Sequence, residues 1–107
     1  LNWANVVVNA TPVGMYPKSN QEIIDSDLFK KIKGLKNKYF FDAIFNPYKT
    51  KLLQNAEKNG AKICSGIYML IYQGIAAFKL WTGIDLFGIN IESIKNLLIK
   101  YLANYSS

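Results

Sequence analysis

The sequence contains no histidine and no arginine, and its only cysteine is Cys64. A single cysteine cannot form an internal disulfide, and without histidine it has no partner within the chain for a metal site or for cysteine–histidine catalysis. We therefore expect no metal and no cysteine nucleophile. Cys64 falls at the end of a predicted core strand, where a free thiol acts as a small apolar residue.

The chain also lacks the signals of an exported or membrane-bound protein. Its first residues, Leu1 to Ala4, carry no charged region and no long apolar run, so no signal peptide is predicted. Its most apolar helical stretch is about sixteen residues long and is interrupted by Gln73 and Lys79, whereas roughly twenty residues are needed to span a bilayer. These absences predict a cytoplasmic protein with no membrane partner.

Acidic residues are few relative to basic ones, since thirteen lysines stand against seven acids and the net charge is +6. Five of the lysines fall between Lys30 and Lys38, an arrangement that could mark a nucleic-acid surface. The cluster contains no arginine, and no aromatic residue is interleaved with it before Tyr39. We interpret it as a solvated surface and expect no nucleic-acid partner. A small basic binding module without catalysis is the alternative from another functional class.

Apolar residues, by contrast, are abundant: 50% of the chain is hydrophobic and 14% is aromatic. A chain of this length is one domain or part of one, and it can bury about 60–70% of its unfolded surface. The apolar content exceeds what a solvated domain of this size needs. We therefore expect an exposed apolar face, as on a piece of a larger core.

Three apolar stretches have the length and composition of strands. Val6 to Val8 form a continuous apolar run, which is typical of a strand covered on both faces in a parallel sheet. The other predicted strands are Tyr39 to Phe45 and Ala61 to Cys64. Combined with the helices between and after them, they predict an α/β fold: a partial, Rossmann-like, doubly wound parallel sheet, namely its second half of about three strands, with C-terminal helices.

Capping residues mark where the helices begin and end. Gly60 is placed as the C′ glycine of a helix through Asn59. Side chains that accept hydrogen bonds from free backbone amides predict helix starts at Asp25 or Ser26, at Thr50 and at Asn90.

The helix that begins near Ile67 is apolar on almost every side, so we expect it to be buried nearly all round, which in a chain this small calls for a second domain or a partner. Gln73 is its polar exception, and a buried amide left unpaired would cost about 1–3 kcal/mol. Either Gln73 bonds to nearby backbone or water, or it binds a ligand. Gly66, at the turn before this helix, would let the backbone approach a ligand closely.

Four groups of residues occur in a fixed order along the chain. They are Asn9-Ala10-Thr11-Pro12-Val13-Gly14-Met15, Phe41-Asp42-Ala43-Ile44-Phe45-Asn46-Pro47-Tyr48-Lys49-Thr50, Gly60-Ala61-Lys62 followed by Gly66-Ile67-Tyr68-Met69-Leu70 with Gln73, and Leu80-Trp81-Thr82-Gly83. In this order and spacing they resemble the C-terminal part of shikimate dehydrogenase, over about Asn5 to Gly83. That family is a two-domain, NADP-dependent oxidoreductase that interconverts shikimate and 3-dehydroshikimate in aromatic amino-acid biosynthesis.

The resemblance implies that residues 1–107 are the C-terminal segment of a Rossmann NADP-binding domain. The family's catalytic lysine and aspartate lie in an N-terminal substrate domain, and its glycine-rich loop opens the Rossmann domain. No Gly-x-Gly-x-x-Gly occurs here, and the family's Asn-Arg-Thr segment cannot be present without arginine. We therefore expect that N-terminal part to be missing from this chain. The segment would then hold no catalytic residue and would be inactive alone.

For the cofactor, the resemblance implies a nicotinamide half-site. The backbone carbonyl of Gly66 would meet the nicotinamide carboxamide, and Ala43 would occupy a nicotinamide-side position at a strand end. Met69 and Leu70 would pack against the nicotinamide ring. The ribose and pyrophosphate of NADP would pass the loop formed by Asn9, Ala10 and Thr11.

For the substrate, Gln73 matches the glutamine that bonds shikimate hydroxyls, and an amide can both donate and accept hydrogen bonds. Phe45 falls where the family commonly carries tyrosine, which leaves a quinate or dual-specificity dehydrogenase open as a related alternative. Tyr68 falls where glycine is usual and would place bulk beside the nicotinamide. Asp42 has no second carboxylate and no histidine near it in sequence, so we interpret it as structural rather than as an acid or base.

Overall fold

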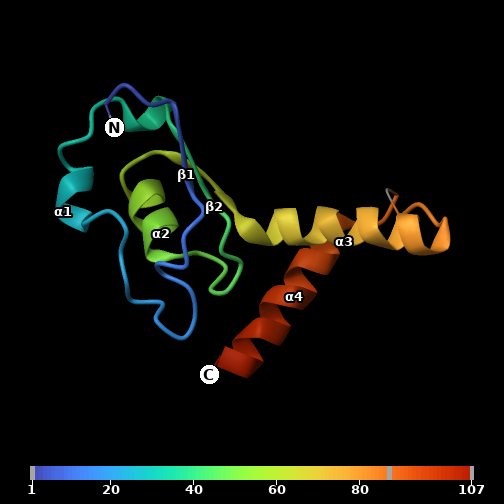
Figure 1. The fold of residues 1–107 in the computed structure, drawn as a ribbon. Helices are drawn as coiled ribbons and strands as arrows, with labels where there is room; N and C mark the ends of the chain where they lie inside the picture. Colours follow the sequence, from blue (N-terminus) through green and yellow to red (C-terminus); the bar gives the residue numbers. More distant parts are fainter. Residues whose placement is uncertain (1, 87, 107) are drawn as a thin grey trace.

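The computed structural model describes residues 2–86 and 88–106, and its centre is a three-stranded parallel sheet in the order β1-β2-β3 (Figure 1). The strands are β1 (Val6–Asn9), β2 (Tyr39–Asp42) and β3 (Lys62–Ser65). Their register pairs Asn9 with Asp42 and Asp42 with Ser65, so all three strands end at the same edge of the sheet. The predicted α/β class and the partial parallel sheet are confirmed.

The helices begin at the positions that were predicted from their capping residues. Their bounds are α1 (Ser26–Phe29), α2 (Lys51–Lys58), α3 (Gly66–Thr82) and α4 (Ile91–Ser106), with a 3-10 turn at Leu35–Asn37. Asp25 and Thr50 accept hydrogen bonds from backbone amides of α1 and α2, and Asn90 accepts one from the Ser93 amide in α4. Gly60, with a φ of 95°, follows the end of α2 as expected for a C′ glycine.

The second strand is shorter than the sequence predicted, because it ends at Asp42 rather than at Phe45. The carboxylate Oδ1 of Asp42 accepts a hydrogen bond from the backbone amide of Ile44 at 3.1 Å. Such a local bond competes with continued strand pairing and turns the chain at this point. The turn places Ala43 and Phe45 in a loop beyond the sheet.

One face of the sheet holds the main core. Phe40 of β2 packs with side chains of α1 and α2. The cluster also takes in one residue of the 3-10 turn and the residue before β3, and its buried members besides Phe40 are Phe29, Leu35, Leu52, Leu53, Ala56 and Ala61. Val7 is partly buried against it.

The opposite face of the sheet is open in the described part of the chain. Successive side chains of a strand point to opposite faces, and Val6 and Val8 are 60% and 57% exposed. Cys64 on β3 is exposed as well. The predictions that strand 6–8 is covered on both faces and that Cys64 is a core residue are therefore wrong for this chain.

The long helix α3 extends away from the sheet, and α4 returns against its side (Figure 1). Its buried side chains form one narrow stripe of Ile67, Ile71 and Ile75, against which α4 packs with Ile91, Ile94, Leu98 and Leu102. At the far end of α3, Trp81 is 83% exposed. Within this chain the helix is not buried on all sides, and the expected exposed apolar face is confirmed. Burial of the remaining sides by a second domain or a partner stays a prediction.

Candidate functional site

The candidate site lies at the sheet edge where the three strands end. Because Asn9, Asp42 and Ser65 are in register, the residues that directly follow them, Ala10, Ala43 and Gly66, share that edge. In open α/β sheets, ligands bind beyond the carboxyl ends of the strands. Three residues predicted to contact a cofactor from separate parts of the sequence are thus brought to one place.

Beneath this edge, Asp42 is fully buried and holds the two neighbouring loops in position. Its Oδ1 accepts a hydrogen bond from Asn9 Nδ2 at 3.2 Å, and its Oδ2 accepts one from Thr50 Oγ1 at 2.6 Å. Thr50 also caps α2 by accepting a hydrogen bond from the Leu53 amide. These bonds confirm the structural interpretation of Asp42, because its carboxylate is used within the protein.

The side chain of Asn9, 3% exposed, shapes the loop after β1. Its Oδ1 accepts hydrogen bonds from the backbone amide of Thr11 at 3.0 Å and from Thr11 Oγ1 at 2.6 Å. Its Nδ2 also donates to the Val13 carbonyl at 3.3 Å. Asn9 therefore fixes the conformation of residues 10–13, and its direct contact with a cofactor stays a prediction.

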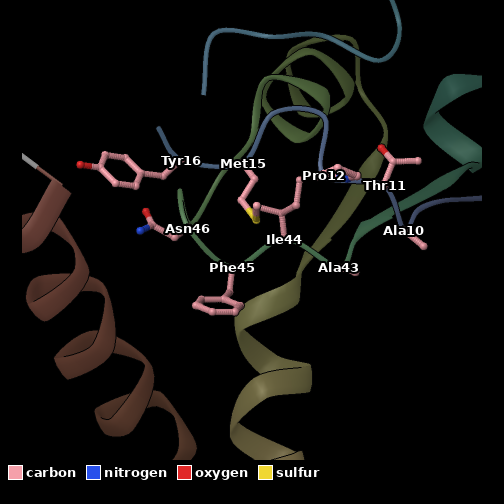
Figure 2. A pocket seen from close by; sticks show the side chains of 9 residues that line it. All are labelled: Ala10, Thr11, Pro12, Met15, Tyr16, Ala43, Ile44, Phe45 and Asn46. Carbon is pink, nitrogen blue, oxygen red and sulfur yellow. The ribbon is translucent and has the colours of Figure 1, made fainter. Parts of the chain in front are cut away.

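A pocket of about 490 Å³ opens between this loop and the loop after β2 (Figure 2). Four predicted site residues, Ala10, Thr11, Ala43 and Phe45, contribute to its wall, and the other lining residues are Pro12, Met15, Tyr16, Ile44 and Asn46. Most of the lining side chains are apolar, and those of Ala10 and Ala43 are small. Pockets that bind small organic molecules are typically concave and mostly apolar, with a few polar groups, and this wall has that composition.

Met15 and Tyr16 line the pocket but were not predicted as site residues. The backbone amide of Tyr16 donates to the Asn46 carbonyl at 2.9 Å, and this bond joins loops that are thirty positions apart in the sequence. No local pattern signals such a long-range pairing. Pro12 and Gly14 mark a turn before Met15, but they do not indicate which side chains line a pocket.

Gly66 begins α3 against the backbone of the loop after β2. A Cβ at this position would lie 2.7 Å from the carbonyl oxygen of Asp42 and nearer still to the carbonyl group of Ala43. The absence of a side chain is thus required for packing of the helix on the strand end. The sequence had suggested a close approach to a ligand, and contact of Gly66 with a cofactor stays a prediction.

The remaining predicted residues, Met69, Leu70 and Gln73, lie on α3 and do not line the pocket. At spacings of three, four and seven from Gly66 they share one side of the helix with it. Leu70 lines a separate apolar groove between α3 and α4. Gln73 is exposed and its side chain has no hydrogen bond within the described residues, which agrees with the interpretation that it faces water. Its role as a ligand-binding amide stays a prediction.

Tyr68 faces α4 and takes part in a polar cluster there. Its hydroxyl donates to Glu92 Oε1 at 3.2 Å, and Glu92 Oε2 lies 2.5 Å from Lys95 Nζ. The same ammonium lies 5.7 Å from the centre of the Tyr68 ring and 5.8 Å from that of Tyr48. The placement of Tyr68 beside the nicotinamide, which the family resemblance implies, stays a prediction.

The ionisation of this cluster follows from its contacts. The hydrogen bond to Glu92 raises the pKa of Lys95, and the hydrogen bond to Tyr68 adds to the effect. The hydrogen bond from Lys95 lowers the pKa of Glu92, and burial raises the pKa of Tyr68. At neutral pH the cluster therefore contains a charged ammonium, a charged carboxylate and a neutral phenol.

Of the five lysines between Lys30 and Lys38, four are exposed and one is buried. Lys38 is 3% exposed, and its ammonium donates to the carbonyls of Asn2 and Ala4, which fixes the segment before β1. Within residues 2–86 and 88–106, no helix is long and apolar enough to cross a membrane.

Comparison with known proteins gives one consistent family. Residues 66–86 match the model of the shikimate 5'-dehydrogenase C-terminal domain. An NADP(+) shikimate dehydrogenase of Methanocaldococcus jannaschii is 43% identical over 99 residues, which are 92% of this chain and 33% of that protein.

Solved structures agree with the sequence comparison. A shikimate dehydrogenase in complex with NADP+ superposes with a TM-score of 0.76 at 41% identity, over 92% of this chain and 32% of that one. A quinate dehydrogenase from Corynebacterium glutamicum in complex with NAD has a TM-score of 0.72 at 28% identity, over 92% of this chain and 34% of that one. This chain thus spans about a third of the length of these relatives, and the resemblance seen in its motifs is confirmed: in sequence and in fold it is similar to the C-terminal part of shikimate dehydrogenases.

Proposed function

We propose that this chain is the C-terminal segment of an NADP-dependent shikimate dehydrogenase, which reversibly reduces 3-dehydroshikimate to shikimate in aromatic amino-acid biosynthesis. The observation that carries the proposal is the convergence of Ala10, Ala43 and Gly66 on the edge of the parallel sheet, next to the pocket. Residues 1–107 would supply the nicotinamide half of the cofactor site and one ligand of the substrate.

The pocket fits part of a dinucleotide rather than the whole of it. Its volume of about 490 Å³ and its apolar wall suit the nicotinamide end, and NADP, when bound, supplies the hydride chemistry. In the proposal, Ala43 and Gly66 border the nicotinamide, and the loop with Asn9, Ala10 and Thr11 passes the ribose and pyrophosphate. Met69 and Leu70 lie on α3 outside the pocket wall, and they would pack against the ring from there. The small residues Ala10, Ala43 and Gly66, with the fixed backbone around them, would hold the nicotinamide ring in one orientation.

Gln73 is proposed as the substrate ligand of this segment. It lies one turn beyond Met69 on the side of α3 that starts at Gly66. Its exposed amide has a donor and an acceptor to offer, which suits neighbouring hydroxyl groups of a cyclic polyol. Phe45, on the pocket wall, would contribute an apolar contact near the substrate.

The acid and base of the reaction are proposed to lie outside this segment. Asp42 is buried and hydrogen-bonded within the protein, and no carboxylate lines the pocket. We therefore propose an N-terminal substrate domain, together with the glycine-rich first part of the Rossmann domain, as the missing partner in a cytoplasmic two-domain enzyme. The segment alone would be inactive.

The test is NADP+-dependent oxidation of shikimate by the product of the complete reading frame that contains this chain. Gln73→Ala should lower kcat/KM by about tenfold to a hundredfold, as expected for the loss of a hydrogen bond to a desolvated polar group. Asn96→Ala, which removes an exposed amide on α4, is the control and should leave the rate unchanged. Absence of turnover with shikimate and with quinate in the unmodified protein would refute the proposal.

Quinate is the second candidate substrate. Phe45 lines the pocket without a hydroxyl that could bind the substrate, and the chain is 28% identical to a quinate dehydrogenase in the aligned region. Comparing kcat/KM for the two acids decides between them. If kcat/KM is higher for quinate than for shikimate, the substrate is quinate and the protein is still a dehydrogenase.

A further inference from the structure

Lys95 of α4 lies between two aromatic rings that belong to different parts of the fold. Its ammonium is 5.8 Å from the ring centre of Tyr48, in the loop after β2, and 5.7 Å from that of Tyr68, in the first turn of α3. Cations within about 6 Å of a ring centre are attracted to the negative ring face. The side chain of Lys95 is 15% exposed, and that of its partner Glu92 is 63% exposed.

Glu92 completes the arrangement from the same helix. It lies 2.5 Å from the Lys95 ammonium and accepts a hydrogen bond from the Tyr68 hydroxyl. The carboxylate therefore orients both the cation and one of the two rings. We call the group of Tyr48, Tyr68, Glu92 and Lys95 the latch.

The latch joins α4 to the loop that forms one wall of the candidate site. Tyr48 follows Phe45 and Asn46, which line the 490 Å³ pocket, by only two or three positions. The carbonyl of Tyr48 also accepts a hydrogen bond from Ser65 Oγ at 2.7 Å, and Ser65 caps α3 directly before Gly66. A shift of Tyr48 would thus displace both the pocket wall and the start of α3.

Beyond the latch, α4 and this loop are loosely packed. A cavity of about 160 Å³ lies between Asn46, Pro47 and Tyr48 on one side and Ile99, Leu102 and Ala103 of α4 on the other. The main apolar contacts of α4 go to α3 instead. Tyr48 is itself partly buried against the cluster of Ile67, Ile71 and Ile75 that α4 covers. The charged contact adds a direct link between the Tyr48 ring and α4.

We propose that Lys95 is a positioning residue, which through Tyr48 and Tyr68 holds the loop at 45–48 and the start of α3 in the arrangement that binds the cofactor and substrate. The proposal rests on the proposed function. Without the cation, the binding-competent arrangement would be populated only part of the time, and apparent affinity falls by that fraction. The chemistry itself would be unaffected once ligands are bound.

The test compares Lys95→Met, Lys95→Arg and Lys100→Met in the product of the complete reading frame. Methionine keeps the apolar stem but not the charge, whereas arginine keeps the cation over both rings. Lys100 is exposed on the same helix and is the control. We expect Lys95→Met to raise KM for NADP+ and shikimate about threefold to tenfold with little change in kcat, and we expect Lys95→Arg to restore most of the affinity.

Hydrogen exchange of the backbone amides of Asn46, Tyr48 and Lys49 provides a second readout that does not depend on turnover. Exchange in this loop should be faster in Lys95→Met than in Lys95→Arg or Lys100→Met. An unchanged KM together with unchanged loop exchange in Lys95→Met would overturn the proposal. An altered loop in a protein without dehydrogenase activity would instead refute the proposed function and leave the latch itself in place.

Discussion

Replacing Gly66 with alanine should destabilise the protein, because the new methyl group would meet backbone atoms on the end of β2. An ideal Cβ at this position lies 2.7 Å from the Asp42 carbonyl oxygen and 2.5 Å from the Ala43 carbonyl carbon. Carbon atoms pack favourably at about 3.5–4.0 Å, so α3 would have to move away by about 1 Å. No change of rotamer can relieve a contact with backbone.

The size of the effect follows from what that movement would disturb. A methyl group forced into a close-packed contact typically costs about 1–3 kcal/mol. A displaced helix start would also weaken the cap that Ser65 provides to α3 and the hydrogen bond from Ser65 to Tyr48, and a lost N-cap costs about 1 kcal/mol. We expect Gly66→Ala to lower the free energy of unfolding by about 2–4 kcal/mol.

Gly74→Ala on the same helix is the matched control. A Cβ at Gly74 meets nothing within 4 Å, and alanine is favoured over glycine in a helix interior by about 0.5–1 kcal/mol. The two substitutions add the same atom and should change stability in opposite directions, as measured by urea unfolding followed by circular dichroism. If Gly66→Ala were as stable as the unmodified protein, the close approach of α3 to the strand end would be refuted.

Two further predictions concern hydrogen-bonded groups. Thr50→Ala removes both the cap of α2 and a hydrogen bond to the buried Asp42 carboxylate, so the free energy of unfolding should fall by about 2–3 kcal/mol. Thr50→Ser keeps the hydroxyl and should retain most of this stability. Equal losses of stability in both variants would contradict this reasoning. Because Lys95 lowers the pKa of Glu92 below its ordinary value of 4.5, this carboxylate stabilises the fold above that pH, and the stabilisation is lost as pH falls through the lowered pKa. Glu92→Gln should therefore show a smaller loss of stability on acidification than the unmodified protein in urea titrations at neutral and acidic pH.

The elements that could be predicted from the sequence are those whose signals are local. Thr50 and Gly60 lie on either side of α2, and both its cap and its end follow from these two residues. The row of Ala10, Ala43 and Gly66 was only partly accessible, because the second strand was predicted to continue to Phe45 and ends at Asp42. The family motifs supplied the expectation that this edge is functional.

The differences between expected and observed burial have a common physical origin. Val6 to Val8 and the apolar sides of α3 carry the composition of buried surface, and the sequence analysis therefore placed them in a core. In this chain nothing among the described residues covers Val6, Val8 or Trp81, so composition predicted what the residues can bury rather than what is buried here. Gln73 is exposed for the same reason.

The latch was missed because only half of it has a sequence signature. Glu92 and Lys95 are three positions apart on one helix, a spacing at which opposite charges meet. Their contact with Tyr48 and Tyr68 depends on how α4 returns along α3, and no spacing in the sequence reports that path. The pocket residues Met15 and Tyr16 depend on a similar long-range approach of two loops.

The open side of β1 has a consequence for how this chain behaves in concentrated solution. Within the described sheet β1 has β2 as its only neighbour, so its outer edge presents unpaired backbone groups next to the exposed Val6 and Val8. Such an edge is a template for strand addition and aggregation. A strand supplied from outside this segment would satisfy those groups and begin to cover the valines, which ties the solubility of the chain to the presence of a neighbour in the sheet.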